Sequence, residues 1–144
     1  MECFRTARNL IVVIVILMSS LTAPWLVAAE AADFDHVTAA ELKKMIESGE
    51  KGFVIVDVQP AGAYKIGHIK GAINFPWDQD LKSAGKLPKD KLLILYCDCS
   101  HEEDSIDTAT QLQDKWDYTN IKLLQGGWSG WVELGYPMEK GKKK

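Results

Sequence analysis

Two cysteines, Cys97 and Cys99, are the strongest candidates for chemistry in this sequence. Cys97 is the last residue of an apolar run, Leu92–Cys97, that is typical of a buried strand. A helix is expected to follow at Ser105–Asp117, with Ser105 as its N-cap. The unpaired N–H groups of its first turn and the positive end of the helix dipole stabilise a nearby anion. The sequence therefore predicts a lowered pKa and a reactive thiolate at Cys97.

Alternating strands and helices are expected to position these cysteines. The continuous apolar runs Phe53–Val58 and Leu92–Cys97 predict strands that are buried on both faces. Thr38 and Glu41 have the spacing of a capping box at the start of a helix. This order of elements predicts parallel βαβ units, whose ligands bind beyond the carboxyl ends of the strands. The other expected elements are short strands at Ala72–Phe75 and Ile121–Leu124, helices at Ala39–Ser48 and Trp128–Leu134, and helical turns at Pro60–Tyr64 and Asp78–Ala84.

The composition describes one globular domain. The chain has 144 residues, of which 47% are hydrophobic and 26% are charged. Its net charge of -3 and pI near 5.6 argue against a nucleic-acid partner. Three cysteines are too few for a small protein that depends on a network of disulfides.

Residues 1–31 have the three-part layout of a secretory signal peptide. Arg5 and Arg8 precede an apolar run, Leu10–Met18, and small residues around Ala29 offer a cleavage site. We expect a periplasmic or secreted protein, and an uncleaved membrane anchor facing outward is the alternative. The expected mature domain, residues 33–139, contains no arginine and is followed by a lysine-rich tail, residues 140–144.

Four segments, taken together and in this order, resemble a rhodanese-homology domain. The resemblance implies a rhodanese-like α/β fold with three layers, in which helices flank a five-stranded parallel sheet on both faces. It also implies sulfur transfer through a persulfide on Cys97, without a metal or organic cofactor. The implied partners are a small sulfur donor or a persulfide-bearing protein and a thiol acceptor, and we expect a monomer. The segments are Val54–Pro60, Tyr64–Pro76, Leu95–Cys97, and Leu124–Trp131 with Gly135–Pro137.

The segment 97–105, which we call the cysteine loop, departs from the common rhodanese pattern. It carries four acidic residues and no arginine, and Gln59 stands where an arginine often follows the first strand. A carboxylate roughly 6 Å from the sulfur opposes the thiolate by about 3 kcal/mol at an effective dielectric constant near 20. We therefore expect the acidic side chains to point outward and thiosulfate, a dianion, to be a poor donor. The backbone N–H groups expected to stabilise the thiolate and persulfide are those of Asp98, Cys99, Ser100, His101, Glu102, Glu103, Asp104 and Ser105.

The sequence leaves the role of Cys99 open. Three roles are open. Cys99 attacks the Cys97 persulfide as a resolving thiol, or it is a ligand of copper(I) or zinc together with Cys97 and His101, or it only lines the loop. A sulfurtransferase, a thiol-redox or metal-handling protein, and a rhodanese-fold binding module without turnover therefore stay open. Phosphatase and arsenate-reductase activities are disfavoured because the mature chain has no arginine to bind their oxyanions.

Four further residues are expected to support the cysteine loop. Asp57 ends the first long strand and is expected to bond to loop backbone near the active site. Gly126 and Gly127 are expected to permit a close backbone approach beside it. Trp128 is expected to pack in the core, and a place at the mouth of the pocket is the alternative. His68 is expected to be structural rather than a general base.

Overall fold

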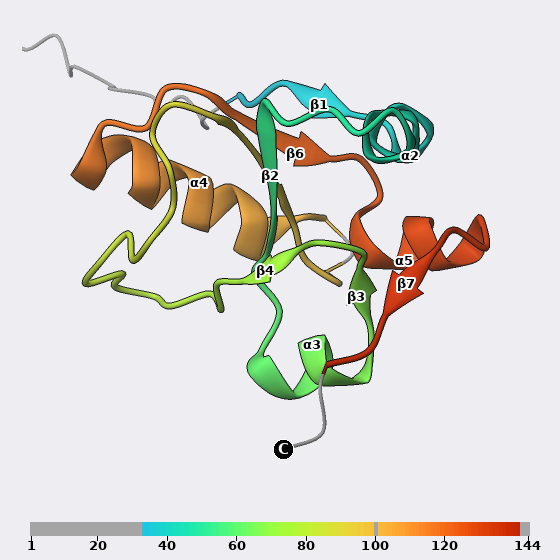
Figure 1. The fold of residues 1–144 in the computed structure, drawn as a ribbon. Helices are drawn as coiled ribbons and strands as arrows, with labels where there is room; N and C mark the ends of the chain where they lie inside the picture. Colours follow the sequence, from blue (N-terminus) through green and yellow to red (C-terminus); the bar gives the residue numbers. More distant parts are fainter. Residues whose placement is uncertain (1–32, 100, 142–144) are drawn as a thin grey trace, which may run out of the picture. The chain divides into compact units, whose positions relative to one another are not determined.

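Five parallel strands form the central sheet in the order β1-β6-β5-β2-β4 (Figure 1). The computed structural model describes residues 33–99 and 101–141. A short antiparallel pair, β3 and β7, lies apart from this sheet. The parallel sheet expected from the sequence is confirmed. The strands are β1 (His36–Val37), β2 (Phe53–Asp57), β3 (His68–Ile69), β4 (Ile73–Asn74), β5 (Leu92–Tyr96), β6 (Ile121–Leu124) and β7 (Met138–Glu139).

Helices cover both faces of the sheet. The helix α4 (Glu103–Trp116) packs on one face, and α2 (Ala39–Glu47) and α5 (Gly127–Glu133) pack on the other (Figure 1). Alternate side chains of the central strand β5 enter the two cores, since successive side chains of a strand point to opposite faces. Leu95 and Cys97 belong to the core on the α4 side, and Tyr96 belongs to the other core. The side chain of Cys97 is therefore directed to the same side of the sheet as α4.

The capping box at the start of α2 is confirmed. The Thr38 hydroxyl accepts a hydrogen bond from the Glu41 N–H at 3.2 Å, and the Glu41 carboxylate accepts one from the Thr38 N–H at 2.8 Å. The helix ends at Glu47, one residue earlier than expected, with Ser48 as its C-cap. The short helix α3 (Ala61–Ile66) follows Pro60 and ends before Gly67.

The start of α4 differs from the expectation. Glu102, and not Ser105, is the N-cap residue, and it has a left-handed backbone conformation with φ 61°. The helix therefore begins at Glu103, two residues earlier than expected, and Ser105 is buried in its first turn. Because Asp and Glu side chains also suit the first turn of a helix, the pattern around Ser105 did not fix the boundary.

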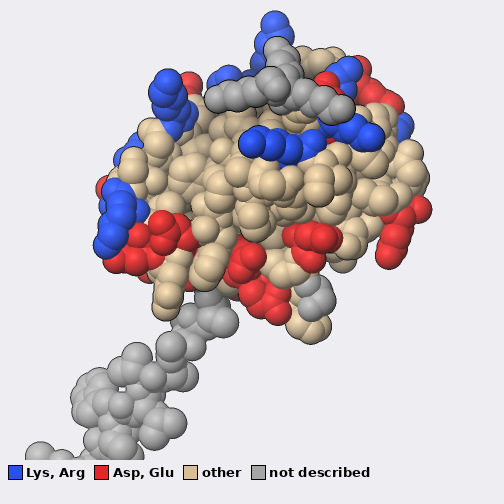
Figure 2. Space-filling model, turned by 90° about the horizontal axis from the view of Figure 1, so that it is seen from below, with Lys and Arg blue, Asp and Glu red and all other residues tan. Residues whose placement is uncertain are grey.

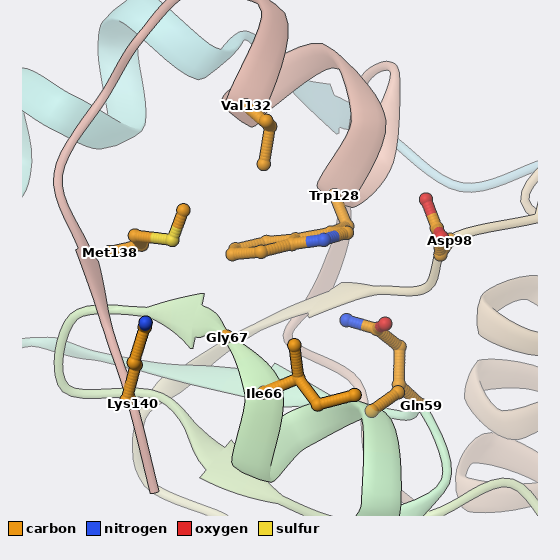
Figure 3. Close-up of a pocket in the computed structure, with 9 residues that line it drawn as sticks. Gln59, Ile66, Gly67, Asp98, Trp128, Val132, Met138 and Lys140 are labelled. Atoms are coloured by element: carbon orange, nitrogen blue, oxygen red, sulfur yellow. The ribbon is translucent and has the colours of Figure 1, made fainter.

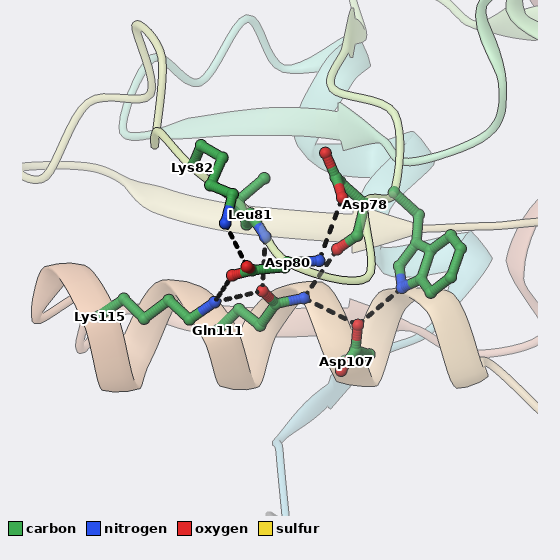
Figure 4. Close-up of polar contacts among 8 residues, drawn as sticks. Asp78, Asp80, Leu81, Lys82, Asp107, Gln111 and Lys115 are labelled. Atoms are coloured by element: carbon green, nitrogen blue, oxygen red, sulfur yellow. Dashed lines mark hydrogen bonds and ion pairs between the residues drawn. The ribbon is translucent and has the colours of Figure 1, made fainter.

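The segment 78–84, where the sequence predicted a helical turn, contains no helix. Two of its backbone groups are paired with a side chain of α4 instead (Figure 4). The Gln111 amide accepts a hydrogen bond from the Leu81 N–H and donates one to the Asp78 carbonyl oxygen, both at 2.8 Å. Lys115 adds an ion pair to Asp80 at 2.9 Å. This long-range network satisfies the segment without the local hydrogen bonds of a helix.

Several expectations fall outside the described residues. The expected signal peptide, Ser100 of the cysteine loop and the last three lysines of the tail belong to this group. Within the described part of the chain, no helix has both the length and the apolar character needed to cross a membrane.

Candidate active site

Cys97 is the first residue after the central strand β5, and its side chain is almost fully buried, with 1% of the residue exposed. The carbonyl oxygen of Cys97 accepts a hydrogen bond from the Trp128 N–H at 2.9 Å, at the start of α5. Gly127 makes this approach possible, because a Cβ atom at this position would lie 2.4 Å from the same oxygen. The close backbone approach expected from the sequence is thus present at Gly127.

Cys97 and Cys99 are joined by a disulfide bond. Their Cα atoms are 5.5 Å apart, within the usual range for bridged cysteines, although only one residue separates them. A sulfur in a disulfide has no proton to lose, so the lowered pKa expected for Cys97 stays a prediction about the reduced protein. The structure therefore shows the two cysteines in their oxidised form, and reduction would give two neighbouring thiols.

One acidic side chain of the cysteine loop is largely shielded from solvent by its contacts with other segments. The Glu102 carboxylate, with 17% of its side chain exposed, contacts His36 Nε2 of β1 at 2.8 Å. Its other oxygen accepts a hydrogen bond from the Gly126 N–H at 3.0 Å. A single side chain therefore joins the cysteine loop to β1 and to the turn that begins α5.

Two more carboxylates of the loop accept hydrogen bonds nearby. Asp98 Oδ1 accepts one from the Ser129 hydroxyl at 2.6 Å, and Glu103 Oε2 accepts one from the His101 N–H at 3.2 Å. The Glu102 N–H donates to the Cys99 carbonyl oxygen at 3.3 Å. The N–H groups of His101 and Glu102 are thus engaged within the loop, which differs from the expectation that they face the sulfur. The N–H groups of the first turn of α4 have no carbonyl of a preceding turn to bind and still fit that role.

A pocket of about 480 Å³ borders the cysteine loop at Asp98 (Figure 3). The Trp128 indole forms its central wall and also packs against the core, where it stacks with Tyr96, so both roles expected for this residue are found. Asp98 and Gln59 lie at one end of the indole, and Met138 and Lys140 lie at the other. The rest of the lining is largely apolar and consists of Ala63, Ile66, Gly67 and Val132.

Asp57 bonds to the backbone of the loop that follows β2, beside the pocket. Its buried carboxylate accepts hydrogen bonds from the Gln59 N–H at 2.8 Å and from the Tyr96 hydroxyl at 2.5 Å, and not from the cysteine loop. Burial raises the pKa of Asp57, and these hydrogen bonds oppose that effect. Burial also raises the pKa of Tyr96, and the neighbouring Asp57 charge adds to the shift. Asp57 thus fixes Gln59 at the edge of the pocket.

Two hydroxyl groups on α4 are buried without a hydrogen-bond partner. Among the described side chains, Ser105 Oγ and Thr108 Oγ1 are the buried polar atoms in this condition. Ser105 shares a face of α4 with Ala109, which packs in the same core cluster as Cys97. A free hydroxyl donor is therefore available on the side of the sheet that holds the Cys97 side chain.

The alternative metal site is not assembled. Over residues 33–99 and 101–141, no three His, Cys, Asp or Glu side chains gather in a metal-binding arrangement. His101 contributes its backbone to the loop, and both sulfurs are bonded to each other. His68 is structural as expected, because its ring stacks on Tyr64 at 3.8 Å between centroids and its Nδ1 contacts the Tyr64 carbonyl oxygen at 2.8 Å.

The comparisons with known proteins give the family. A family model described as "Rhodanese-like domain" matches residues 38–134, about two thirds of the chain. The chain belongs to the rhodanese-like family. A solved structure of the BH2092 protein from Bacillus halodurans is 28% identical with a TM-score of 0.64, and the match covers 74% of this chain and 77% of that one. The fold and the family are therefore both established.

The curated relatives differ in overall function. The chain is 32% identical over 123 residues to an HTH-type transcriptional regulator, Rv0324, of Mycobacterium tuberculosis, and the match covers 80% of this chain but 51% of the regulator. It is 33% identical over 103 residues to the sulfur carrier protein TtuD of Thermus thermophilus, with 60% of this chain and 35% of TtuD covered. It is 28% identical over 102 residues to the thiosulfate sulfurtransferase GlpE of Shewanella oneidensis, with 71% of this chain and 96% of GlpE covered. Sulfur transfer is thus represented among the rhodanese-like relatives. The chain spans about half or less of the length of Rv0324 and of TtuD.

Three residues at the site were missed from the sequence. His36 contacts Glu102, Ser129 binds Asp98, and the Tyr96 hydroxyl binds Asp57. Each contact joins segments at least 31 residues apart, so no local spacing reveals it. The apolar run Leu92–Cys97 offered one usable signal in the sequence, because a tyrosine buried next to Cys97 needs a hydrogen-bond partner for its hydroxyl.

Proposed function

We propose that this rhodanese-like protein is an exported sulfurtransferase in which Cys97 carries sulfane sulfur as a persulfide. The observation that carries the proposal is the position of Cys97. It follows the central strand, its backbone is fixed by the Trp128 N–H, and it precedes the unpaired first turn of α4. Backbone donors at a helix start stabilise a thiolate or a persulfide anion in the manner of an oxyanion hole.

The proposed reaction has two nucleophilic steps. The Cys97 thiolate attacks the sulfane sulfur of a donor, a new S–S bond forms, and the rest of the donor leaves with the electron pair of the broken bond. An acceptor thiolate then attacks the outer sulfur of the persulfide, and the Cys97 thiolate is restored. Because Cys97 is bonded to Cys99 in the structure, reduction of this disulfide must precede the first step.

The site favours an uncharged or weakly charged donor group. All positive side chains of the described residues are lysines and histidines, so no guanidinium is available to bind the sulfonate end of thiosulfate with two parallel hydrogen bonds. On the face seen from below, most acidic side chains lie along the lower edge, whereas the lysines lie mainly along the upper and left edges (Figure 2). Asp98, the neighbour of Cys97 in the chain, borders a pocket with a largely apolar wall that neither cysteine lines, and this wall suits the organic part of a thiol-linked persulfide better than a dianion.

The Cys97–Cys99 disulfide favours a second function, that of a thiol-redox protein without sulfur transfer. In that case both cysteines are required for activity, because dithiol–disulfide exchange uses both sulfurs. A binding module without turnover requires neither cysteine for binding to its partner.

Steady-state turnover distinguishes these functions. The reduced full-length chain is assayed with a polysulfide and with thiosulfate as donors and with cyanide as the acceptor, and thiocyanate is measured. The donor comparison uses Cys99→Ser, because Cys99 in the wild type can trap Cys97 as the disulfide. We expect turnover with polysulfide, at least about tenfold less with thiosulfate, and none above the uncatalysed rate in Cys97→Ser. Equal turnover with both donors contradicts the proposed donor preference. Turnover of Cys97→Ser equal to that of Cys99→Ser contradicts the role of Cys97. Absence of thiocyanate with the wild type and with Cys99→Ser, together with dithiol–disulfide exchange that needs both cysteines, supports the redox function.

The proposed export rests on residues 1–31 and has its own test. The chain is expressed in a bacterium with its N-terminus intact, and the mass of the purified product is measured. Loss of residues through Ala29 or Ala31 supports a cleaved signal peptide. An intact N-terminus in the membrane fraction supports an anchor, and an intact N-terminus in the cytosol contradicts export.

A further inference from the structure

The backbone on both sides of the disulfide is held by contacts that do not involve sulfur. The Trp128 N–H binds the Cys97 carbonyl oxygen at 2.9 Å, and the Glu102 N–H binds the Cys99 carbonyl oxygen at 3.3 Å. Between them, the Asp98 side chain is bound by the Ser129 hydroxyl at 2.6 Å. We therefore expect the loop to keep this conformation when the disulfide is reduced, with the two thiols adjacent.

The burial of the two cysteines favours a reaction between them. Cys97 is 1% exposed, and Cys99 is partly buried against the core cluster that contains Cys97. An external acceptor has to reach a sulfur at the edge of this core, whereas the Cys99 sulfur is already within bonding distance. A nucleophile held in place in this way reacts with an effective concentration far above that of a dissolved thiol.

We propose that Cys99 is the resolving thiol of this site, so that the protein reduces sulfane sulfur to sulfide at the expense of thiols. This inference rests on the proposed persulfide at Cys97. The Cys99 thiolate attacks the inner sulfur of the persulfide, Sγ of Cys97. The Cys97–Cys99 disulfide forms, the bond to the outer sulfur breaks, and hydrosulfide leaves with the electron pair and takes up a proton.

The disulfide in the structure is the product of this step. Two molecules of a thiol reductant regenerate the site: the first forms a mixed disulfide with one cysteine, and the second releases both protein thiols and leaves as the oxidised disulfide. In the balanced cycle, one persulfide and two thiols give one thiol, one hydrogen sulfide and one disulfide. The substrate class is therefore organic persulfides and polysulfides, and the co-substrate is a thiol.

A single-turnover experiment tests the inference. The full-length wild type and Cys99→Ser are reduced, freed of reductant, and mixed with less than one equivalent of an organic persulfide, whose transfer to Cys97 releases a thiol and not sulfide, and no other thiol is added. We expect the wild type to release sulfide at least about tenfold faster than the variant and to lose two hydrogens as the disulfide forms. Cys99→Ser is expected to hold the added sulfur on Cys97 until an external thiol is supplied.

The outcomes separate this inference from the proposed function. If wild type and Cys99→Ser both hold a stable persulfide, or release sulfide at equal rates, Cys99 is not the resolving thiol and the sulfurtransferase proposal stands. If neither protein gains sulfur, the proposed function fails and the inference fails with it. Cys99→Ala serves as a second variant, since agreement with Cys99→Ser excludes an effect of the serine hydroxyl.

Discussion

The carbonyl oxygen of Cys97 accepts the backbone N–H of Trp128 at 2.9 Å, and this hydrogen bond joins the end of the central strand to the start of α5. The residue between the two segments, Gly127, has a positive φ of 53° and approaches the Cys97 oxygen too closely for any side chain. The backbone conformation of the candidate nucleophile thus depends on a glycine that lies 30 residues further along the chain.

Gly127→Ala is expected to lower the free energy of unfolding by at least about 2 kcal/mol, because a left-handed alanine and a clash with backbone both oppose the native contact. Gly62→Ala is the matched control, since Gly62 lies in α3 and a Cβ atom added there would have no other atom within 4 Å. This control is expected to be neutral or slightly stabilising. Denaturant unfolding measures both variants, and equal stabilities contradict the close approach at Gly127.

The Glu102 side chain and its backbone are expected to have opposing effects on stability. The carboxylate joins His36 to the Gly126 N–H, whereas the left-handed backbone conformation is unfavourable for any residue except glycine. Glu102→Ala is therefore expected to cost about 1–3 kcal/mol through the lost hydrogen bonds. Glu102→Gly loses the same bonds but relieves the backbone, so it is expected to be more stable than Glu102→Ala by about 1 kcal/mol.

Asp117 provides the control for the backbone effect. It is the other non-glycine residue with positive φ among the described residues, at 54°, and it is the C-cap of α4. Asp117→Gly is expected to raise the free energy of unfolding without changing the alkylation rate of reduced Cys97. If Glu102→Gly is the most stable of the Glu102 proteins, wild type included, the carboxylate contacts do not hold the loop.

The sequence predicted the elements with long regular patterns and missed those defined by distant partners. The apolar runs at Phe53–Val58 and Leu92–Cys97 gave the two central strands, and the Thr38–Glu41 spacing gave the capping box. β1, β3 and β7 are two residues long, too short for a periodic pattern. The segment 78–84 resembled a helical turn locally, but Gln111 of α4 satisfies its backbone from outside.

The candidate site was predicted in part. The place of Cys97 at the carboxyl end of a central strand follows from a local pattern, and the structure has it there. The inward carboxylate of Glu102 could not be predicted, because its partners His36 and Gly126 lie on other elements. Pairing of Cys97 with Cys99 was one of three open interpretations, since spacing alone does not fix the loop conformation.

The unpartnered hydroxyls on α4 predict stabilising substitutions. A buried hydroxyl without a hydrogen bond carries a desolvation cost, so Ser105→Ala and Thr108→Val are each expected to raise the free energy of unfolding by about 1 kcal/mol. Ser105, which lies one turn nearer to the start of α4 than Thr108, is also expected to donate to the Cys97 thiolate in the reduced protein. Ser105→Ala should then raise the Cys97 pKa and slow its alkylation at neutral pH, whereas Thr108→Val should not. A lower stability of Ser105→Ala in the disulfide form, where the structure gives Ser105 no partner, contradicts this account.

The ion pairs of Asp80 predict a pH dependence. Hydrogen bonds from Lys82 and Lys115 lower the pKa of Asp80 from its ordinary value of 3.8 to about 2. A carboxyl whose pKa is lower in the folded state stabilises the fold above its unfolded pKa, and this contribution is lost as the pH falls. Wild type is therefore expected to be more stable than Asp80→Asn at pH 7. This difference in the free energy of unfolding should disappear as the pH falls from 3.8 to about 2. Asp90→Asn is the control, because Asp90 takes part in none of the ion pairs among the described residues.

The mass of the reduced protein after exposure to polysulfide tests the central claim most directly. The measurement uses Cys99→Ser, in which the resolving thiol is absent and an added sulfur is retained, followed by peptide mapping. We predict the gain of one sulfur atom on the peptide that contains Cys97, and no gain in Cys97→Ser. No added sulfur in Cys99→Ser, or an equal gain in Cys97→Ser, would contradict a persulfide at Cys97.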